Sequence, residues 1–308
     1  MNRNRGAVGV IGVPTSAGAF APGQEQAPAA LREAGLVALL RDGGVEVSDY
    51  GDCPAWRWRP DRERPRAQNL GKVIEIVHDT AARVGEAKLA GETSLVLGGD
   101  CTVGIGTVAG HVESSDGVGL IYFDLHADLN VPGSVRPGTL DWMGVAHMLG
   151  VDGAEPELVE AGPRAPLLSP EQVLLFAWGR EGAEPGEGEV VDRLGIEAIL
   201  DEEVRADPAA AAARAIDSLG ARSERILVHF DVDVVDFTDT PLSEEPGRNQ
   251  GIAYEQAAAA LAVLLASPKL TGVTVTELNP NHVEEGAGSI ERLARDLAGA
   301  LAGGAGSR

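Results

Sequence analysis

The sequence predicts an α/β protein of three layers, in which a mainly parallel, doubly wound sheet lies between two layers of helices. Short apolar and β-branched runs alternate along the chain with longer helix-like stretches. This alternation is typical of parallel strands that are joined by right-handed crossover helices. Several of the apolar runs are nearly continuous, as expected for strands that are buried on both faces.

Each expected strand is a short apolar or β-branched run that is bounded by polar or glycine-containing segments. In chain order these runs are AVGVIGV (7–13), VEVSDYG (45–51), TSLVLGG (93–99), GVGLIYFDLH (117–126), QVLLFAW (172–178), RILVHFDVD (225–233) and LTGVTVTEL (270–278). Because the strands alternate with helical segments, we expect most of them to pair in parallel.

The segments between the strands are predicted as helices, near 26–42, 67–90, 102–113, 140–149, 207–220, 254–267 and 287–302. In the last of these, Ile290, Leu293 and Leu297 recur at helical spacing. Patches rich in glycine and proline are predicted as surface loops, at 14–28, 52–66, 152–170 and 182–188. The sequence shows no internal repeat and no long linker, so we expect residues 1–308 to form one domain.

The chain carries a large excess of negative charge, with 25 Lys and Arg against 47 Asp and Glu and a formal net charge of -22. Such a chain repels phosphate backbones and anionic lipids, so we expect neither nucleic acid nor a membrane as a partner. A solvated acidic surface explains most of the charge, which also favours metal ions or a small cationic substrate. Two cysteines are too few for a disulfide framework, and no signal peptide is found, which favours a cytoplasmic protein.

Four predicted strands end in acidic or metal-ligating residues, and ligands bind beyond the carboxyl ends of the strands in doubly wound sheets. These residues are Asp100 and Cys101, then Asp124, His126 and Asp128, then Asp231 and Asp233, and finally Glu277. In DLHAD (124–128), alternate side chains of extended backbone share one face and can converge on one point. A lone DxD motif is more often a turn or a cap, but the combination of motifs favours a site.

Carboxylates that are gathered in this way need positive charge nearby. The four carboxylates of DLHAD and DVD and the imidazole of His126 cannot share a low-dielectric cleft without cations, because the mutual repulsion of the carboxylates would be prohibitive. Ligand sets rich in oxygen with one or two nitrogens suit Mn²⁺ or a related divalent ion, and the number of ligands suffices for two ions. Two such ions would lower the pKa of a shared water and prepare it to attack an electrophilic carbon.

Taken together, these motifs resemble those of the ureohydrolase family, which includes arginase, agmatinase and formimidoylglutamase. GGDCT stands where the family has Gly-Gly-Asp-His-Ser, and DLHADLN matches its Asp-Ala-His-x-Asp-x-Asn. FDVDVVD matches Phe-Asp-x-Asp-x-x-Asp-Pro, and TELNP matches Glu-x-Asn-Pro. The resemblance covers essentially the whole chain. It implies a three-layer α/β/α fold and a binuclear manganese centre that hydrolyses a guanidino or formimino group.

The resemblance also implies roles for individual residues. One metal ion would be bound by Cys101, Asp124, Asp128 and Asp231, and the other by Asp124, His126, Asp231 and Asp233. Asp128 would also accept a hydrogen bond from the attacking water, and Glu277 would pair with the guanidinium of the substrate. Family members often form trimers or hexamers, so a homo-oligomer is expected.

Two departures from the family pattern fall inside the predicted site. Cys101 occupies a histidine ligand position, and its thiolate would add negative charge, weaken the Lewis acid and favour a softer metal ion. Alternatively, that ion site is empty and Cys101 is a small buried apolar residue. Asp141 stands where arginases carry a histidine that transfers protons. It would serve as an acid if its neighbours raised its pKa, or else it is a helix-start carboxylate without a catalytic role.

The expected substrate loop differs as well. Asn130 is retained, Ser134 offers a hydroxyl, and Glu181 keeps an acidic position, so these three are the predicted substrate contacts. Val135 and Pro137 stand where arginases use hydroxyl side chains to bind the substrate's α-carboxylate. These changes argue against ordinary L-arginine bound in the usual way.

Several further positions near the predicted site depart from the family or lie outside its motifs. Ala183 replaces the aspartate that binds the α-amino group, and Glu184 is a possible substitute. Arg136 is either an exposed loop residue or a partner for an anionic substrate group. His229 replaces a serine and Phe237 replaces a proline around the second aspartate motif. His111 and His147 lie on predicted helices and are interpreted as structural.

The leading functional hypothesis is a metal-dependent amidinohydrolase that acts on a guanidino compound other than plain L-arginine, such as a modified arginine. One alternative is an amide deacylase with a single zinc ion, which the thiol of Cys101 makes conceivable. A second alternative is a non-catalytic relative that binds a ligand without turnover. Metal content distinguishes the first alternative from the leading hypothesis, and turnover distinguishes the second.

Overall fold

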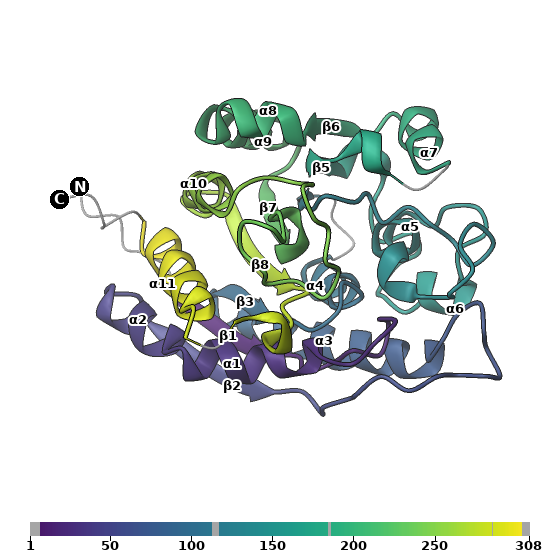
Figure 1. Cartoon of the computed structure of the whole chain (residues 1–308), viewed down its shortest axis with the longest axis horizontal. Coiled ribbons are helices and arrows are strands. Elements are labelled where there is room, and N and C mark those ends of the chain that lie inside the picture. The colour runs from purple at the N-terminus through teal and green to yellow at the C-terminus, as the bar shows by residue number, and fades with distance from the viewer. Residues whose placement is uncertain (1–6, 113–116, 184–185, 285, 304–308) are drawn as a thin grey trace.

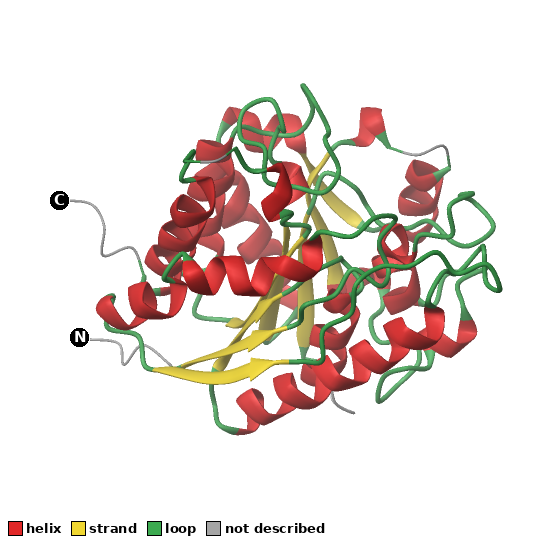
Figure 2. Cartoon of the chain, turned by 60° about the horizontal axis from the view of Figure 1, so that its bottom comes forward, coloured by secondary structure: helices red, strands yellow, loops and turns green. Residues whose placement is uncertain are grey.

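The computed structural model describes residues 7–112, 117–183, 186–284 and 286–303, and its centre is one eight-stranded sheet (Figure 1). Across the sheet the strand order is β2-β1-β3-β8-β7-β4-β5-β6, and every neighbouring pair is parallel. The strands are β1 (Val8–Gly12), β2 (Val47–Asp52), β3 (Thr93–Leu97), β4 (Val118–Phe123), β5 (Val173–Trp178), β6 (Glu197–Leu200), β7 (Arg225–Asp231) and β8 (Leu270–Thr276). Helices cover both faces (Figure 2), which confirms the predicted three-layer fold.

The helices follow the strands in the alternating order that the sequence predicts. They are α1 (Ala27–Glu33), α2 (Leu36–Asp42), α3 (Leu70–Leu89), α4 (Val103–His111), α5 (Gly144–Leu149), α6 (Pro156–Val159), α7 (Glu187–Leu194), α8 (Asp201–Ala206), α9 (Pro208–Arg222), α10 (Tyr254–Leu264) and α11 (Ser289–Leu301). Among the described residues, none of these helices combines the length and the apolar character that crossing a membrane requires.

Two hydrophobic cores lie on the two faces of the sheet, because successive side chains of a strand point to opposite sides. In β4, Ile121 and Phe123 belong to one core, whereas Leu120 and Tyr122 belong to the other. Helices α1, α2, α9, α10 and α11 complete the first core, and α3, α4 and α5 complete the second. Strands β1, β4 and β5 are buried along their whole length, as expected from their continuous apolar runs.

Two regions differ from the sequence expectation. The single helix expected at 26–42 is divided into α1 and α2, because Gly35 adopts a left-handed conformation (φ 84) between them. Elements α7, β6 and α8 are not predicted from the sequence, and loops are predicted where α6 and the start of α7 lie. Strand β6 has 4 residues that begin with Glu197 and are mostly half-buried at the sheet edge, so it shows no long apolar run.

The four strands that carry predicted site residues lie side by side in the middle of the sheet, in the order β3-β8-β7-β4. The chain passes from β3 to β4 and leaves a gap that β7 and β8 fill later, so the direction of winding reverses here. In open α/β sheets, ligands bind beyond the carboxyl ends of the strands at such a reversal. The topology therefore brings the predicted residues to one place.

The turn after β3 needs a glycine because two backbone segments meet there. A Cβ atom on Gly99 would lie 1.6 Å from the carbonyl oxygen of Thr15. Asp100 secures the same junction, since its amide donates to the Thr15 carbonyl at 3.2 Å and its Oδ2 accepts from the Gly18 amide at 2.9 Å. The close approach fixes the backbone that carries Cys101.

We expect Gly99→Ala to lower the free energy of unfolding by about 1–3 kcal/mol, the usual cost of overpacking, because the backbone of Thr15 cannot move aside as a flexible side chain would. Gly85→Ala is the matched control. Apart from its own helix, α3, no described atom lies within 4 Å of the Cβ that it would add, and alanine is preferred to glycine inside a helix. Urea unfolding of both variants measures the effect. An unchanged midpoint for Gly99→Ala would contradict the close approach.

Candidate metal and substrate site

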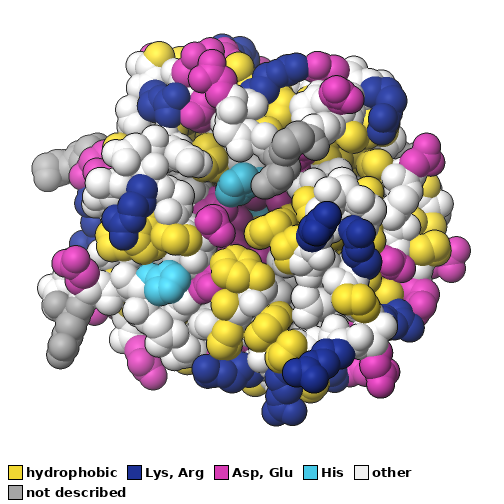
Figure 3. Space-filling model, turned by 45° about the vertical axis from the view of Figure 1, so that its right-hand side comes forward, with side chains coloured by type: hydrophobic (Ala, Val, Ile, Leu, Met, Phe, Trp, Pro, Cys, Tyr) yellow, Lys and Arg dark blue, Asp and Glu magenta, His cyan; other side chains and the backbone are white. Residues whose placement is uncertain are grey.

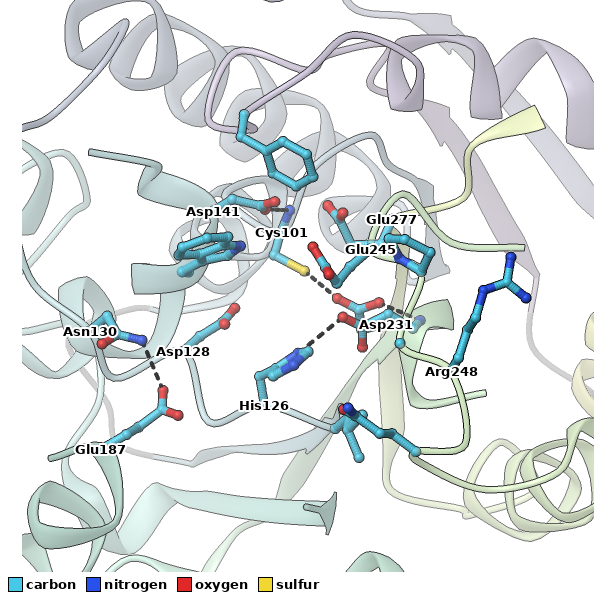
Figure 4. Close-up of a pocket in the computed structure, with 17 residues that line it drawn as sticks. Cys101, His126, Asp128, Asn130, Asp141, Glu187, Asp231, Glu245, Arg248 and Glu277 are labelled. Carbon is cyan, nitrogen blue, oxygen red and sulfur yellow. Dashed lines mark hydrogen bonds and ion pairs between the residues drawn. The ribbon is translucent and has the colours of Figure 1, made fainter. Parts of the chain in front are cut away.

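The carboxyl ends of the central strands line a cavity of about 260 Å³. In Figure 3 acidic side chains form the floor of a hollow in the molecular surface, with hydrophobic side chains around its mouth. The predicted site residues that line the cavity (Figure 4) are Cys101, His126, Asp128, Asn130, Asp141, Asp231, Asp233 and Glu277. Asp124 lies outside this lining and is 1% exposed.

The segment after β4 bends instead of continuing as a strand. Strand β4 ends at Phe123 and residues 124–126 form a bend, so the expectation of extended backbone along DLHAD is wrong. Asp124 and His126 meet through this bend, because the His126 amide donates to Asp124 Oδ1 at 2.6 Å. The His126 ring then reaches the end of β7, where its Nδ1 lies 3.0 Å from Asp233 Oδ2.

Two acidic side chains enter the site from strained backbone. Asp128 has a φ of 48 and Glu277 a φ of 65, a region that residues other than glycine seldom adopt. Each conformation is held by a specific contact: Tyr122 Oη donates to Asp128 Oδ2 at 2.5 Å, and the Glu277 amide donates to the Gly99 carbonyl at 2.8 Å. Strain of this kind gathers at functional sites.

Cys101 lies against the end of β7. Its Sγ donates to Asp231 Oδ2 at 2.9 Å and lies 3.3 Å from His229 Nε2 and 3.2 Å from Thr276 Oγ1. Asp231 Oδ1 in turn accepts from the Asp233 amide at 2.7 Å, which fixes the turn that carries the second aspartate. The thiol therefore lies among polar groups, although the residue is 2% exposed.

Three sets of side chains hold their metal-ligating atoms within 4.8 Å of one another. The sets are Cys101, Asp124, His229 and Asp231; then Asp124, His126 and Asp233; and then Cys101, Asp141 and Glu277. Asp124 belongs to the first two sets. Among the described residues, Asp128 belongs to none of the three sets, although it lines the same cavity.

Several buried atoms of these sets have no hydrogen-bond partner among the described residues: Asp124 Oδ2, Asp233 Oδ1, His229 Nδ1 and Glu277 Oε1. A buried polar atom without a partner costs free energy, so native proteins rarely leave one unpaired. Carboxylate oxygens with free lone pairs beside an imidazole and a thiol are a chemically suitable set for divalent cations. The residues present therefore fit metal ions.

Burial and mutual repulsion favour the protonated form of most of these carboxyl groups in the protein alone. The exception is Asp233: burial raises its pKa, but the charge and the hydrogen bond of His126 hold it below the ordinary value. Burial, followed by the charge of Asp233, raises the pKa of Asp124 to about 7. Burial and neighbouring carboxylates also raise the pKa values of Asp128 and Asp231 well above the ordinary range. Burial by itself lowers the pKa of His126, but Asp233 and Asp124 hold it well above its usual value. Bound cations would reverse this balance.

Asp141 lies in η2 (Leu140–Met143) and lines the cavity. Its Oδ1 accepts from the Cys101 amide at 2.5 Å, so it also secures the turn after β3. Burial, followed by the charge of Asp100, raises the pKa of Asp141 well above the ordinary range. A raised pKa is the condition that the sequence analysis set for a role as an acid, and that role stays a prediction.

His111 and His147 are buried and lie outside the cavity lining. His111 Nε2 lies 2.8 Å from Ser94 Oγ, and His147 Nδ1 lies 2.7 Å from the Met143 carbonyl oxygen. Burial lowers the pKa of His111 to about 3 and that of His147 to about 4, so both rings are neutral. These contacts agree with a structural role.

Asn130 lines the cavity, whereas the other two predicted substrate contacts lie outside its lining. Ser134 is exposed, and its Oγ donates to Asn130 Oδ1 at 3.1 Å. Glu181 is exposed in η4 (Arg180–Gly182). The acidic residue of this region that lines the cavity is Glu187, whose Oε1 accepts from the Leu129 amide at 2.9 Å.

Other departures from the family pattern also lie outside the cavity lining. Val135 is buried, and Arg136 and Pro137 are exposed. Glu184 lies outside the described residues.

Sequence reasoning missed several residues that line the cavity, among them Phe20, Trp142, Glu187, Glu245 and Arg248. Glu187 begins α7, and it falls near the end of the loop that the sequence predicts at 182–188. Glu245 and Arg248 lie in the connection between β7 and α10, where the sequence has no periodicity. The one available signal was the charged run EEPGR (244–248), which follows closely on the DVD motif.

Comparison with known proteins agrees with this geometry. A family model described as the Arginase family matches residues 6–302. Arginase-1 of Homo sapiens is 30% identical over 288 residues, which cover 89% of this chain and 85% of that protein. The structure is similar to that of the arginase from Bacillus caldovelox, with a TM-score of 0.84 and 27% identity over 98% of this chain and 99% of the other.

A more distant neighbour supports the fold alone. The proclavaminate amidino hydrolase of Streptomyces clavuligerus has a TM-score of 0.71 and 18% identity, over 97% of this chain and 93% of the other. The resemblance that the strand-end motifs indicated is therefore confirmed across nearly the whole sequence. On its matched sequence and its fold, this chain belongs to the arginase family.

Proposed function

We propose that this chain hydrolyses a guanidino C–N bond in a small cationic substrate and uses two divalent metal ions to do so. One observation carries the proposal: two ligand sets, in which every residue but His126 is buried, share Asp124 and lie beside Glu277, a cavity-lining carboxylate with an unpartnered oxygen. The ligand sets fit metal ions, and the carboxylate fits a planar cation. Membership of the arginase family supports the same reaction class.

The proposed ligands follow the family resemblance. Cys101, Asp124, Asp128 and Asp231 would hold one ion, and Asp124, His126, Asp231 and Asp233 would hold the other. When bound, two ions would supply an acidified water as the nucleophile and offset the charge of the carboxylates. Mn²⁺ is the ion that we propose, because most of the ligands are carboxylate oxygens.

Glu277 would hold the guanidinium of the substrate in place. Its Oε2 accepts from Gln24 Nε2 at 3.1 Å, which leaves Oε1 for the substrate. A charge-assisted contact to a planar cation fixes both its position and its orientation, and such positioning lowers the barrier to attack. Burial, followed by the charge of Asp141, raises the pKa of Glu277 well above the ordinary range. A bound guanidinium would favour the ionised carboxylate.

Two further carboxyl groups would move the protons. Asp128 would orient the attacking water and accept its proton, and the hydroxyl of Tyr122 would hold Asp128 in position. As the new C–O bond forms and the C–N bond breaks, the leaving amine needs a proton. Asp141 lines the same cavity and, with its raised pKa, is suited to donate that proton.

The mouth of the cavity offers charged groups of opposite sign to the tail of the substrate. Among the described residues that line the cavity, Arg248 is the one Lys or Arg side chain, and it lies across the cavity from Asn130 and Glu187 (Figure 4). A substrate with an anionic and a cationic group on its tail would find complementary charge on the two sides. We propose a modified arginine, because Val135 and Pro137 lack the hydroxyl groups that arginases use to bind the α-carboxylate of L-arginine. Glu187 would take the role that the sequence assigned to Glu181.

The second candidate function is that of a family member that binds a single zinc ion. It is favoured because Cys101 and His229 bring a sulfur and a nitrogen ligand together. Such a protein would act as an amide deacylase or would bind a ligand without turnover. Metal analysis of the purified protein separates the two candidates: two ions per chain support the amidinohydrolase, and one zinc ion per chain supports the alternative.

We expect Glu277→Gln to lower kcat/KM for a guanidino substrate roughly 10- to 150-fold, because a buried hydrogen bond to a charged group is worth about 1.5–3 kcal/mol. Metal content should stay unchanged, since Glu277 is outside both proposed ligand sets. Release of urea or a substituted urea across a panel of guanidino compounds measures the first effect. Glu202→Gln, on the exposed side of α8, is the control and should change neither quantity. Full turnover by Glu277→Gln with both ions bound would contradict the assignment.

We expect the metal-free protein to lose stability as the pH rises from about 5 to 7.5, because its site carboxyl groups bind more protons when folded than when unfolded. The pKa values of Asp124, Asp128, Asp231 and Glu277 are raised in the fold, that of Asp124 to about 7, and these outnumber Asp233, whose pKa is lowered. Their contribution is fully present below an unfolded pKa of about 4 and is lost as the pH passes the folded value. Added Mn²⁺ should therefore raise Tm more at pH 7.5 than at pH 5.

Thermal unfolding with a chelator and with excess Mn²⁺ measures this difference. Asp124→Asn removes one of the groups with a raised pKa, so the fall in Tm with pH should become shallower in that variant. A Tm shift on adding Mn²⁺ that is equal at both pH values would contradict the proposed exchange of protons for cations.

A further inference from the structure

His229 lies beneath the cavity, at the point where the chain departs twice from the pattern of its family. It precedes Asp231 by two residues on β7, so both side chains point to the same side of the sheet. Its Nε2 lies 3.3 Å from Cys101 Sγ and 3.0 Å from Thr276 Oγ1. The position where the family has histidine carries Cys101, and the facing position on β7 carries a histidine instead of a serine. This chain therefore lacks an imidazole in the turn after β3 and carries one on β7 instead.

The packing around His229 holds the ring in this orientation. The ring stacks on Tyr122, with centroids 4.3 Å apart and an angle of 12° between the planes. On its other side the ring approaches α4, where a Cβ atom on Gly104 would lie 2.6 Å from His229 Nδ1. Glycine at this position therefore makes room for the imidazole. The ring is 1% exposed and its Nε2 faces Cys101, so the imidazole itself is shielded from bulk solvent.

The atoms around His229 form a set that could surround one ion. The ligating atoms of Cys101, Asp124, His229 and Asp231 lie within 4.8 Å of one another. One member, Asp124, has an oxygen without a hydrogen-bond partner among the described residues. One sulfur, one imidazole nitrogen and two carboxylate oxygens are four ligands of the kinds that zinc binds in a tetrahedral arrangement.

We propose that His229 is a metal ligand and that it forms, with Cys101, Asp124 and Asp231, a site for a soft divalent ion such as Zn²⁺. The neighbouring set of Asp124, His126 and Asp233 has no sulfur and is the site for a harder ion such as Mn²⁺. The centre is thus a mixed-metal pair that shares Asp124. This inference rests on the proposed metal dependence, but it requires no particular substrate.

Cobalt spectroscopy tests the proposal directly, with Co²⁺ as the probe in place of zinc. One equivalent of Co²⁺ should give a sulfur-to-metal charge-transfer band in the full-length protein. The band should disappear in Cys101→Ser and persist in Cys53→Ser, which removes the other buried thiol. In His229→Gln the ligand-field bands should shift, and the affinity for Zn²⁺ should fall by more than about 100-fold, since loss of an outer-shell partner alone costs 10- to 100-fold.

His126→Gln is the matched control, because it removes the imidazole of the other ligand set. It should weaken Mn²⁺ binding and leave the cobalt spectrum unchanged. X-ray absorption of the zinc-loaded protein does not depend on the folding of a His229 variant. It should show one sulfur at about 2.3 Å and an imidazole nitrogen at about 2.0 Å from zinc. Both should persist in His126→Gln.

Three results would overturn the proposal. The first is a zinc spectrum without sulfur. The second is the loss of the imidazole signal in His126→Gln. The third is a His229→Gln variant with an unchanged cobalt spectrum, which would mean that His229 only positions the thiol by hydrogen bonding. If two Mn²⁺ ions bind and any of these results is found, this inference fails and the proposed function stands. If no divalent ion binds, both fail.

Discussion

The mutual repulsion of buried carboxylates is the constraint on which the rest of this structure depends. Asp124, Asp128, Asp231, Asp233 and Glu277 are each at most 7% exposed and converge at the ends of neighbouring strands. In a low-dielectric interior such a group cannot be fully ionised without cations. In the protein alone, bound protons reduce this repulsion, as the raised pKa values of most of these groups indicate. Divalent ions and a cationic substrate would neutralise the carboxylates with stronger and more directional positive charge.

The fold supplies the rigidity that this arrangement needs. Strands β3, β8, β7 and β4 are adjacent, so the relative positions of their ends are set by the hydrogen bonds of a buried parallel sheet. Asp128 and Glu277 add strained backbone at two of those ends. Asp128 is held by a hydrogen bond from Tyr122 of β4, and Glu277 by one to Gly99 after β3. A site that is built on strand ends is more exactly positioned than one that is built on loops. Repulsive groups can therefore be kept together.

Much of this could be predicted from the sequence, because the information is local. Apolar runs predict strands, and the motifs at their ends predict which strands meet. Contacts between distant segments could not be predicted. The proposed role of His229 depends on its contact with Cys101, which is 128 positions away in the sequence. Glu187 and Arg248 also reach the cavity through contacts between distant segments, and the charged run EEPGR (244–248) was the one signal in the sequence for Arg248. The bend after β4 was missed because an alternating motif also fits a turn.

The central claim is that the shared carboxylate cluster is built for two divalent ions. Anomalous X-ray diffraction from a crystal of the full chain grown with both Mn²⁺ and Zn²⁺ tests it most directly. The account predicts two anomalous peaks at the ends of β4 and β7, with Asp124 between them as a shared ligand. A folded protein with a single peak, or with none, when both ions are saturating would contradict it.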